Sequence, residues 1–366
     1  MECPFKVVSV SGDARECGRQ HGAQARELVQ RNVEYYLGYW SRNLGMTRSD
    51  VLSYGDGMLS AIRGFDEDVH REVLGIAEGS GVDPRLVAAM NARYELAWAS
   101  PSQLMDGCTC ISATPKATAD GGTLLAQNWD YRLGARDGCI VLDASMDGKP
   151  GVVMHTEAGI IGQKGMNSAG LALTVNAMVS ARDRLLDTVP FFAVCRSMLN
   201  CVSFSEAVGV FADARRSFSY NVMLAGEGVA VDLEAHPFDF SIIYPEDGVL
   251  CHTNHFIGEK SRFLVDECLK SEPSTVHRYI VAREGLLQGA GEHSVETFKS
   301  ILRDHFDYPT SICYHPDPRL EHDRQEETIC SVVFSPEERL FLLTGGPPCK
   351  AEYHELRLDT LRGSTS

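Results

Sequence analysis

The local pattern of the chain changes sharply near residue 108, and this change constrains the fold more than any other feature. Before it, helix formers dominate, and residues 16–41 contain no proline. Two further helices are expected at 66–79 and 84–98, the second beginning at a typical N-cap and first helical position, Asp83-Pro84. In the first predicted helix, apolar residues recur at intervals of three and four: Val29, Val33, Tyr36 and Trp40.

After residue 108, short runs typical of β-strands alternate with Gly and Asp, at 123–128, 151–155 and 171–176. Helical patterns follow at 187–214 and 274–304. Strands return at 329–334 and 339–344 around a turn at 336–339, and the most polar stretch, 316–327, is expected to be a surface loop or lid. Strands, helices and strands in this order predict an α+β fold with stacked antiparallel sheets and helices outside them.

Composition narrows the classes of partner. The 366 residues carry a net charge of −16, which argues against nucleic-acid or anionic-membrane partners, because both attract basic surfaces. The sequence contains no apolar run of about 18 residues, so it predicts no membrane span. The ends carry neither a secretory signal nor a peroxisomal address, so a cytoplasmic location is expected.

The twelve cysteines have spacings unlike a disulfide framework. Cys108-Thr109-Cys110 has neither zinc-ribbon nor thioredoxin spacing, so we expect no structural zinc and no other metal or cofactor. Four cysteines in mostly apolar surroundings are expected to be buried free thiols: Cys195, Cys201, Cys313 and Cys330.

The sequence Asp106-Gly107-Cys108-Thr109-Cys110 is a candidate site of self-cleavage. A cut between Gly107 and Cys108 would leave Cys108 with a thiol and a free α-amine, which titrates at about pKa 8 and can therefore serve as the base. Glycine before the cut lets the thiol approach the preceding carbonyl. The alternative is a structural cysteine in a turn.

Further motifs follow this site in a fixed order. The motifs are QNWD at 127–130, HTEAGIIG at 155–162, GMNSAGL at 165–171, Asn176, HTNH at 252–255, Tyr308-Pro309 with Ser311-Ile312-Cys313, and TGGP at 344–347. Earlier elements are GRQHG at 18–22, EVLGIAEG at 72–79, Asn91 and Glu95. In this order and spacing the set resembles the acyl-CoA:6-aminopenicillanate acyltransferases, and more broadly the self-processing cysteine N-terminal-nucleophile (Ntn) hydrolases, which include the β-alanyl-dopamine hydrolases.

The resemblance extends from about residue 10 to about residue 357, nearly the whole chain. It implies a four-layer αββα sandwich preceded by a helical N-terminal segment. It also implies cleavage into segments 1–107 and 108–366 that stay together as one compact domain.

The candidate catalytic residues are Cys108 as nucleophile, Asp130 and Asn254. Asp130 could orient the α-amine or bind a substrate amine, although a turn aspartate that caps a loop is the alternative. Asn254 could donate a hydrogen bond to a tetrahedral oxyanion without changing its protonation state. Asn176 resembles the oxyanion-side asparagine of related enzymes.

The histidines near Asn254 allow several interpretations. His252 and His255 could form a dyad with Cys108 or bind a metal, but packing and hydrogen bonding are favoured because no third ligand is evident nearby. His21 is expected to be structural.

Two positions depart from the penicillin acyltransferases. They have Glu-Phe-Ser-Pro where this chain has Glu234-Ala235-His236-Pro237. Their arginine before the next strand is replaced by Gln325, with Arg324 one residue away. His236 and Arg324 are therefore candidate substrate-binding residues, and both departures put a penicillin substrate in doubt.

The sequence thus predicts an amidohydrolase that acts on a small N-acyl amide through an acyl-thioester enzyme. The alternative is acyl transfer from acyl-CoA to an amine, for which the charge of −16 is unfavourable because phosphates need a basic groove. A binding protein that lost its chemistry is a third possibility, and the presence of Cys108, Asp130 and Asn254 counts against it. Besides substrate, the only expected partner is the chain's own cleaved segment.

Overall fold

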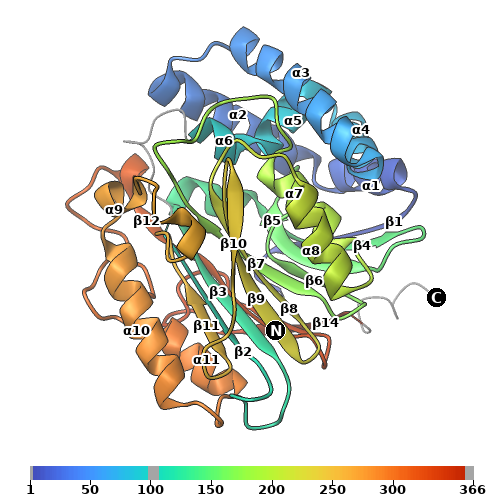
Figure 1. Ribbon diagram of the computed structural model, residues 1–366. Helices are drawn as coiled ribbons and strands as arrows, with labels where there is room; N and C mark the ends of the chain where they lie inside the picture. Colours follow the sequence, from blue (N-terminus) through green and yellow to red (C-terminus); the bar gives the residue numbers. More distant parts are fainter. Residues whose placement is uncertain (1–2, 98–106, 359–366) are drawn as a thin grey trace.

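The computed structural model describes residues 3–97 and 107–358, and Figure 1 shows two stacked sheets between layers of helices. One sheet has eight strands in the order β1-β4-β5-β6-β7-β8-β9-β10. Their bounds are β1 Lys6–Gly12, β4 Cys139–Met146, β5 Val152–Glu157, β6 Gly165–Asn167, β7 Ala172–Ala177, β8 Tyr220–Gly226, β9 Val229–His236 and β10 Asp239–Ile243. Only the β1–β4 pair among these described strands is parallel.

The second sheet has six antiparallel strands in the order β11-β2-β3-β12-β13-β14. Their bounds are β2 Cys108–Ala113, β3 Leu124–Arg132, β11 Val249–His252, β12 Glu326–Ser335, β13 Leu340–Leu343 and β14 His354–Arg357.

The helices fall into three groups along the chain, and Figure 1 shows α10 and α11 on the opposite side of the molecule from the N-terminal helices. The N-terminal group is α1 Ala14–Gln24, α2 Arg26–Leu44, α3 Arg48–Phe65, α4 Glu67–Ser80, α5 Pro84–Asn91 and α6 Arg93–Ala97. The others are α7 Phe191–Leu199 and α8 Phe204–Asp213, then α9 Cys268–Ser271, α10 Ser274–Gln288 and α11 Val295–Leu302. Short 3-10 turns occupy Leu133–Gly138, Glu259–Ser261 and His322–Arg324.

Alternation along the strands builds three hydrophobic cores and so fixes the layers. In β4, Ile140 and Leu142 face a core shared with helices α1–α8, whereas Val141 faces the core between the sheets. In β3, Leu125 faces that middle core, and Ala126 faces a third core shared with α10 and α11. Helices, sheet, sheet and helices therefore form the expected four-layer αββα sandwich.

The N-terminal glycines allow two helices to pack almost backbone to backbone. A Cβ added at Gly18 would lie 2.1 Å from the carbonyl oxygen of Glu72, and one at Gly22 would lie 2.3 Å from that of Ile76. The opening Gly-x-x-x-Gly element thus brings α1 against α4. The sequence predicts one helix over 16–41, but the chain changes direction at Ala25 and forms two.

Other local predictions also needed correction. The sequence analysis predicted no strand at Lys6–Gly12, where each residue of β1 pairs with the residue 134 positions later in β4. It also named no helix at α3, which begins with a capping box between Thr47 and Asp50. The ranges 187–214 and 274–304 each contain two helices rather than one. Of the polar stretch 316–327, the last two residues belong to β12.

Among the residues that the structure describes, no helix is both long and apolar enough to cross a membrane.

Candidate active site

Cys108 opens strand β2 inside the six-stranded sheet and is only 3% exposed. The register pairs it with Trp129, so the next residue of β3, Asp130, lies beside Gly107. The backbone N–H of Asp130 donates to the Gly107 carbonyl at 2.8 Å. On the other side of the same peptide, the N–H of Cys108 donates to Oδ1 of Asn254 at 3.0 Å. Both ends of the Gly107–Cys108 peptide are therefore held by sequence-predicted site residues.

The residue before Cys108 has room for glycine only. A Cβ on Gly107 would lie 2.9 Å from Oδ2 of Asp130 and 3.1 Å from its Cβ. Asp130 is fully buried, and its Oδ1 accepts a hydrogen bond from Thr328 at 2.6 Å. The same Thr328 hydroxyl accepts from the N–H of Tyr314 at 2.9 Å. The carboxylate is thus fixed next to the peptide that the sequence marks for cleavage.

The partners of Asn254 determine the orientation of its amide. Its Oδ1 accepts from two groups that can only donate, the N–H of Cys108 and Nη2 of Arg278, the latter at 2.9 Å. Its Nδ2 donates to the carbonyl of Ala177 at 3.0 Å. An amide nitrogen carries two hydrogens, so one more donor remains for a further acceptor.

Arg278 organises this site from helix α10, although the sequence analysis did not single it out. The side chain is completely buried, and its Nη1 donates to the Cys108 carbonyl at 2.8 Å and to Thr109 Oγ1 at 3.2 Å. Nε donates to Ser274, one turn earlier on the helix. Together with the bond to Asn254, these contacts place a fixed positive charge against the backbone of Cys108.

Asn176 also reaches the Cys108 carbonyl. Its Nδ2 lies 3.3 Å from that oxygen and 3.4 Å from the carbonyl oxygen of His252. Its Oδ1 accepts from Asn221, whose Nδ2 also donates to Asp232 at 2.7 Å. The structure thus brings together Cys108, Asp130, Asn254 and Asn176, four of the residues that the sequence analysis named.

His252 lies in a buried charge cluster just behind the site. Its Nδ1 lies 2.8 Å from the Thr253 carbonyl oxygen, and its Nε2 lies 3.2 Å from Oε2 of Glu234 and 3.8 Å from Oδ2 of Asp232. Burial disfavours its charged form, but the two carboxylates outweigh burial and raise the pKa of His252 to about 9. Both ring nitrogens are engaged, which favours the hydrogen-bonding role over a dyad or metal ligand.

The other two histidines of the sequence analysis have separate environments. Burial lowers the pKa of His255 to about 4, and its Nδ1 lies 3.0 Å from the hydroxyl of Thr275. His21 is fully buried, and its Nε2 accepts from the N–H of Gly159 at 3.0 Å, which is a structural role.

A buried lysine is a further site neighbour that sequence reasoning missed. Nζ of Lys164 lies 4.0 Å from the ring centroid of Trp129, the strand partner of Cys108. Burial lowers the pKa of Lys164, and nearby groups, including the Cys108 thiol, act in the opposite direction.

The structure does not gather His236 and Arg324 with these residues. Arg324 is exposed in a 3-10 turn. Four residue steps separate it from Thr328, roughly 13 Å if the chain is extended. The side chain of Gln325 donates to the Leu320 carbonyl. His236 ends β9 and lines a separate cavity of about 650 Å³. A substrate-binding role for either residue therefore stays a prediction, which for His236 would act through this cavity.

Arg278 could have been found from its place on helix α10. The buried residues of this helix share one face: Ser274, Thr275, Arg278, Ala282 and Leu286. An arginine in such a row is unusual, because buried charges need a dedicated partner. Thr328 carries no comparable signal, since a threonine in a strand is ordinary.

Comparison with known proteins identifies the class. The family model for acyl-coenzyme A:6-aminopenicillanic acid acyl-transferase matches residues 117–348, and the chain belongs to this family of Ntn hydrolases. The acyl-coenzyme A:6-aminopenicillanic-acid-acyltransferase 40 kDa form of Emericella nidulans is 27% identical over 309 residues, 84% of this chain and 84% of that protein. A variant of conjugated bile acid hydrolase from Clostridium perfringens matches in structure with a TM-score of 0.50 at 12% identity, over 69% of this chain and 93% of that one.

Proposed function

We propose that this chain is a self-activating hydrolase of small N-acyl amides, in which cleavage after Gly107 frees Cys108 as an N-terminal nucleophile. The observation that supports the proposal is the set of hydrogen bonds that hold the Gly107–Cys108 peptide. Its carbonyl accepts from the Asp130 N–H, its N–H donates to Asn254, and the carbonyl that follows accepts from Arg278. A peptide held at this many points is presented in one geometry to the thiol beside it.

The cleavage step follows from this geometry. The Cys108 sulfur attacks the Gly107 carbonyl carbon, and the carbonyl electrons move to the oxygen, which the Asp130 N–H stabilises. When the carbonyl re-forms, the C–N bond breaks, and the nitrogen takes the proton that the thiol released. Water then opens the resulting thioester, giving a Gly107 carboxylate, the free thiol and the α-amine of Cys108.

Turnover uses the same atoms on an external amide. The α-amine takes the thiol proton, the thiolate attacks the substrate carbonyl, and the amine product leaves with that proton. Water then hydrolyses the acyl-thioester. Asp130 and the Oδ1 atom of Asn254 lie where they can hold the α-amine, and the second N–H of Asn254 can donate to the oxyanion.

Intact-mass measurement with two alanine variants tests the proposal. Wild type should appear as the segments 1–107 and 108–366, and Cys108→Ala should remain one chain without amidase activity. Cys110→Ala is the matched control, because Cys110 is a buried cysteine two positions along the same strand, with its sulfur 3.7 Å from the Val175 carbonyl oxygen. It should be cut and should turn over N-acyl amides. Normal turnover by Cys108→Ala, or full activity of an uncut wild-type chain, would refute the mechanism.

Acyl transfer from coenzyme A to an amine is the second candidate, and the cavity beside His236 favours it. Four arginines line this cavity of about 650 Å³: Arg182, Arg184, Arg215 and Arg216. The structure gives none of these four an ion pair with a carboxylate in the described part of the chain. Two aspartates, Asp213 and Asp239, also line the cavity, but the arginines outnumber them by four to two. The cavity is therefore locally basic in a chain of net charge −16, as the phosphates of an acyl-CoA would require.

The cavity lies within reach of the candidate site. Across the sheet, Ala177 pairs with Tyr220 and Tyr220 with Ala235, the neighbour of His236. Ala177 and Ala235, the two ends of this row, are two strand spacings apart, or about 10 Å. Ala177 also accepts the hydrogen bond from Asn254. A ligand in the cavity could thus extend to Cys108.

Assays with acyl-CoA and a panel of amines separate the two functions. If transfer occurs, Arg182→Ser with Arg215→Ser should raise the KM for acyl-CoA roughly tenfold or more, because two charge-assisted contacts are lost. The KM for an N-acyl amide should not change. Arg262→Ser, which removes an exposed arginine paired with Glu259, is the control. No amide formation with any pair would reject transfer and leave hydrolysis untouched.

A further inference from the structure

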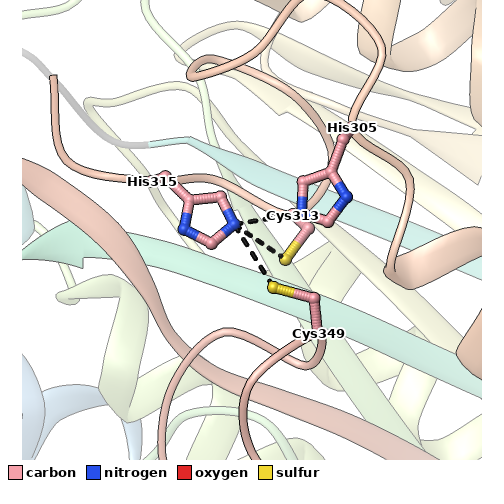
Figure 2. Close-up of side chains that lie close together, drawn as sticks. All are labelled: His305, Cys313, His315 and Cys349. Carbon is pink, nitrogen blue, oxygen red and sulfur yellow. Dashed lines mark hydrogen bonds between the residues drawn. The ribbon is translucent and has the colours of Figure 1, made fainter.

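Four side chains with nitrogen or sulfur ligand atoms converge at a point outside the candidate catalytic residues. They are His305, Cys313, His315 and Cys349, and their ligand atoms all lie within 4.8 Å of one another. Figure 2 shows the His315 ring facing the other three side chains, with dashed lines from its nitrogen to each. The first three come from the loop after α11, whereas Cys349 lies between β13 and β14.

The three distances from His315 are close to those of a tetrahedral coordination shell. Nε2 of His315 lies 3.1 Å from Nε2 of His305, 3.5 Å from Sγ of Cys313 and 3.4 Å from Sγ of Cys349. Zn–N bonds of about 2.05 Å and Zn–S bonds of about 2.3 Å at tetrahedral angles place ligand atoms roughly 3.3 Å (N to N) and 3.6 Å (N to S) apart. One imidazole nitrogen cannot form three good hydrogen bonds at once, because it offers either one hydrogen or one lone pair. A shared cation explains this crowding.

We propose that His305, Cys313, His315 and Cys349 form a structural zinc site. Two thiolates and two imidazoles are a common donor set for tetrahedral Zn²⁺, and four protein ligands leave no open position for catalysis. On binding, each thiol gives its proton to solvent and the sulfur bonds to the metal. His305 and Cys349 are exposed, so an ion can reach the site from solvent.

The proposed zinc site is coupled to the candidate active site through its own loop. Between two of its ligands, Tyr314 donates its backbone N–H to Thr328, which in turn donates to Asp130. The carbonyl of Ile312, next to Cys313, accepts from Asn128 of β3 at 2.8 Å. A zinc ion would tie this loop to the 349 segment and so brace the support of Asp130. Its role would be positioning, since four protein ligands leave the ion no open position for substrate.

Metal analysis of the purified full-length protein, with any affinity tag removed, tests the proposal. Wild type should retain about one zinc ion per chain after gel filtration. With CoCl₂ in place of zinc, the protein should show the visible absorption of tetrahedral cobalt and a thiolate charge-transfer band. His305→Ala with Cys349→Ala, both at exposed positions, should lose stoichiometric metal and the cobalt spectrum.

A cysteine and a histidine outside the cluster provide the control substitutions. Cys3→Ser with His322→Ala changes one cysteine and one exposed histidine outside the cluster and should keep the metal. Three results would each overturn the proposal: no bound zinc or cobalt in wild type, metal retained by the double variant, or a Cys313–Cys349 disulfide found by mass under non-reducing conditions. These readouts do not depend on amidase activity, so they stand or fall separately from the proposed hydrolysis.

Discussion

At the Gly107–Cys108 peptide, the geometry requires residue types that have no close substitute. Any side chain on Gly107 would meet the Asp130 carboxylate at 2.9 Å. Asn254 must accept from the Cys108 N–H and from Arg278 on one side and donate to the Ala177 carbonyl on the other. Only a primary amide of this length offers an acceptor and a donor in one plane.

Asn254→Ala should therefore lower turnover by about 10²–10³-fold, the usual effect of losing one oxyanion donor. Asn254→Asp should be at least as harmful, because it places negative charge against the Ala177 carbonyl and the developing oxyanion. The measurement is the single-turnover rate on fully processed protein, with the melting temperature taken on the same sample. A stable, fully processed Asn254→Ala enzyme with wild-type turnover would remove Asn254 from the mechanism.

At the scale of elements, strands β9 and β11 meet through a buried charge cluster. Asp232 and Glu234 of β9 face His252, the last residue of β11. Glu234 also accepts from the backbone N–H groups of Ile257 and Gly258. The cluster thus joins one sheet to the other directly behind Asn176 and couples folding to protonation.

This coupling predicts a pH-dependent stability. The pKa of His252 is raised to about 9 in the folded chain, so folding retains a proton that the unfolded chain releases near pH 6.5. Its stabilising contribution is complete below pH 6.5 and is lost as pH rises toward 9. The difference in unfolding free energy between wild type and His252→Gln should shrink over this window, by at most about 1.4 kcal/mol per pH unit.

Urea unfolding at a series of pH values from 6.5 to 9 measures this difference. His322→Gln, at an exposed position, should show none. A difference that is constant across the window would mean that His252 is neutral in the folded protein.

At the scale of the whole molecule, the two segments on either side of Gly107 share their interior. Strand β1 is an edge of the eight-stranded sheet, and helices α1–α6 cover the same core as α7 and α8. Two buried ion pairs cross between the segments. Arg93 meets Glu157 at 2.5 Å, and Arg196 meets Glu72 at 2.8 Å, with all four side chains at most 3% exposed.

The two segments of the processed protein should therefore migrate together under native conditions and separate only in denaturant. Glu72→Ala should lower the stability of this assembly by about 3–5 kcal/mol, because it leaves Arg196 buried without its partner. Glu78→Ala is the matched control on the same helix, since Glu78 pairs with Arg15 at the surface and should cost at most about 1 kcal/mol. Gel filtration in increasing urea distinguishes the two variants. Equal effects would indicate that the buried pair does not hold the segments together.

The sequence alone was sufficient for the features that short patterns encode. Short runs typical of strands, bounded by Gly and Asp, predicted the strands that became β3, β5, β7 and β12, because a strand between two cores presents apolar residues to both. Gly107 and Asp130 could be named because both belong to short motifs, Asp-Gly-Cys-Thr and Gln-Asn-Trp-Asp. Helix ends and breaks were predicted less well, since they depend on contacts such as that between Gly18 and the backbone of Glu72.

What only the tertiary structure decided are the contacts between residues far apart in the chain. Arg278 lies 170 positions from the Cys108 carbonyl that it holds, and Thr328 lies 198 positions from Asp130. The four proposed zinc ligands do not form a sequence motif, because two strands separate Cys349 from the other three. A hydrogen bond or a coordination shell depends on distance in space, whereas spacing along the chain reports only what one helix or strand brings together. The sequence therefore predicted the layers and proposed Cys108 as the nucleophile, and the folding of the sheets onto each other decided which distant side chains surround Cys108.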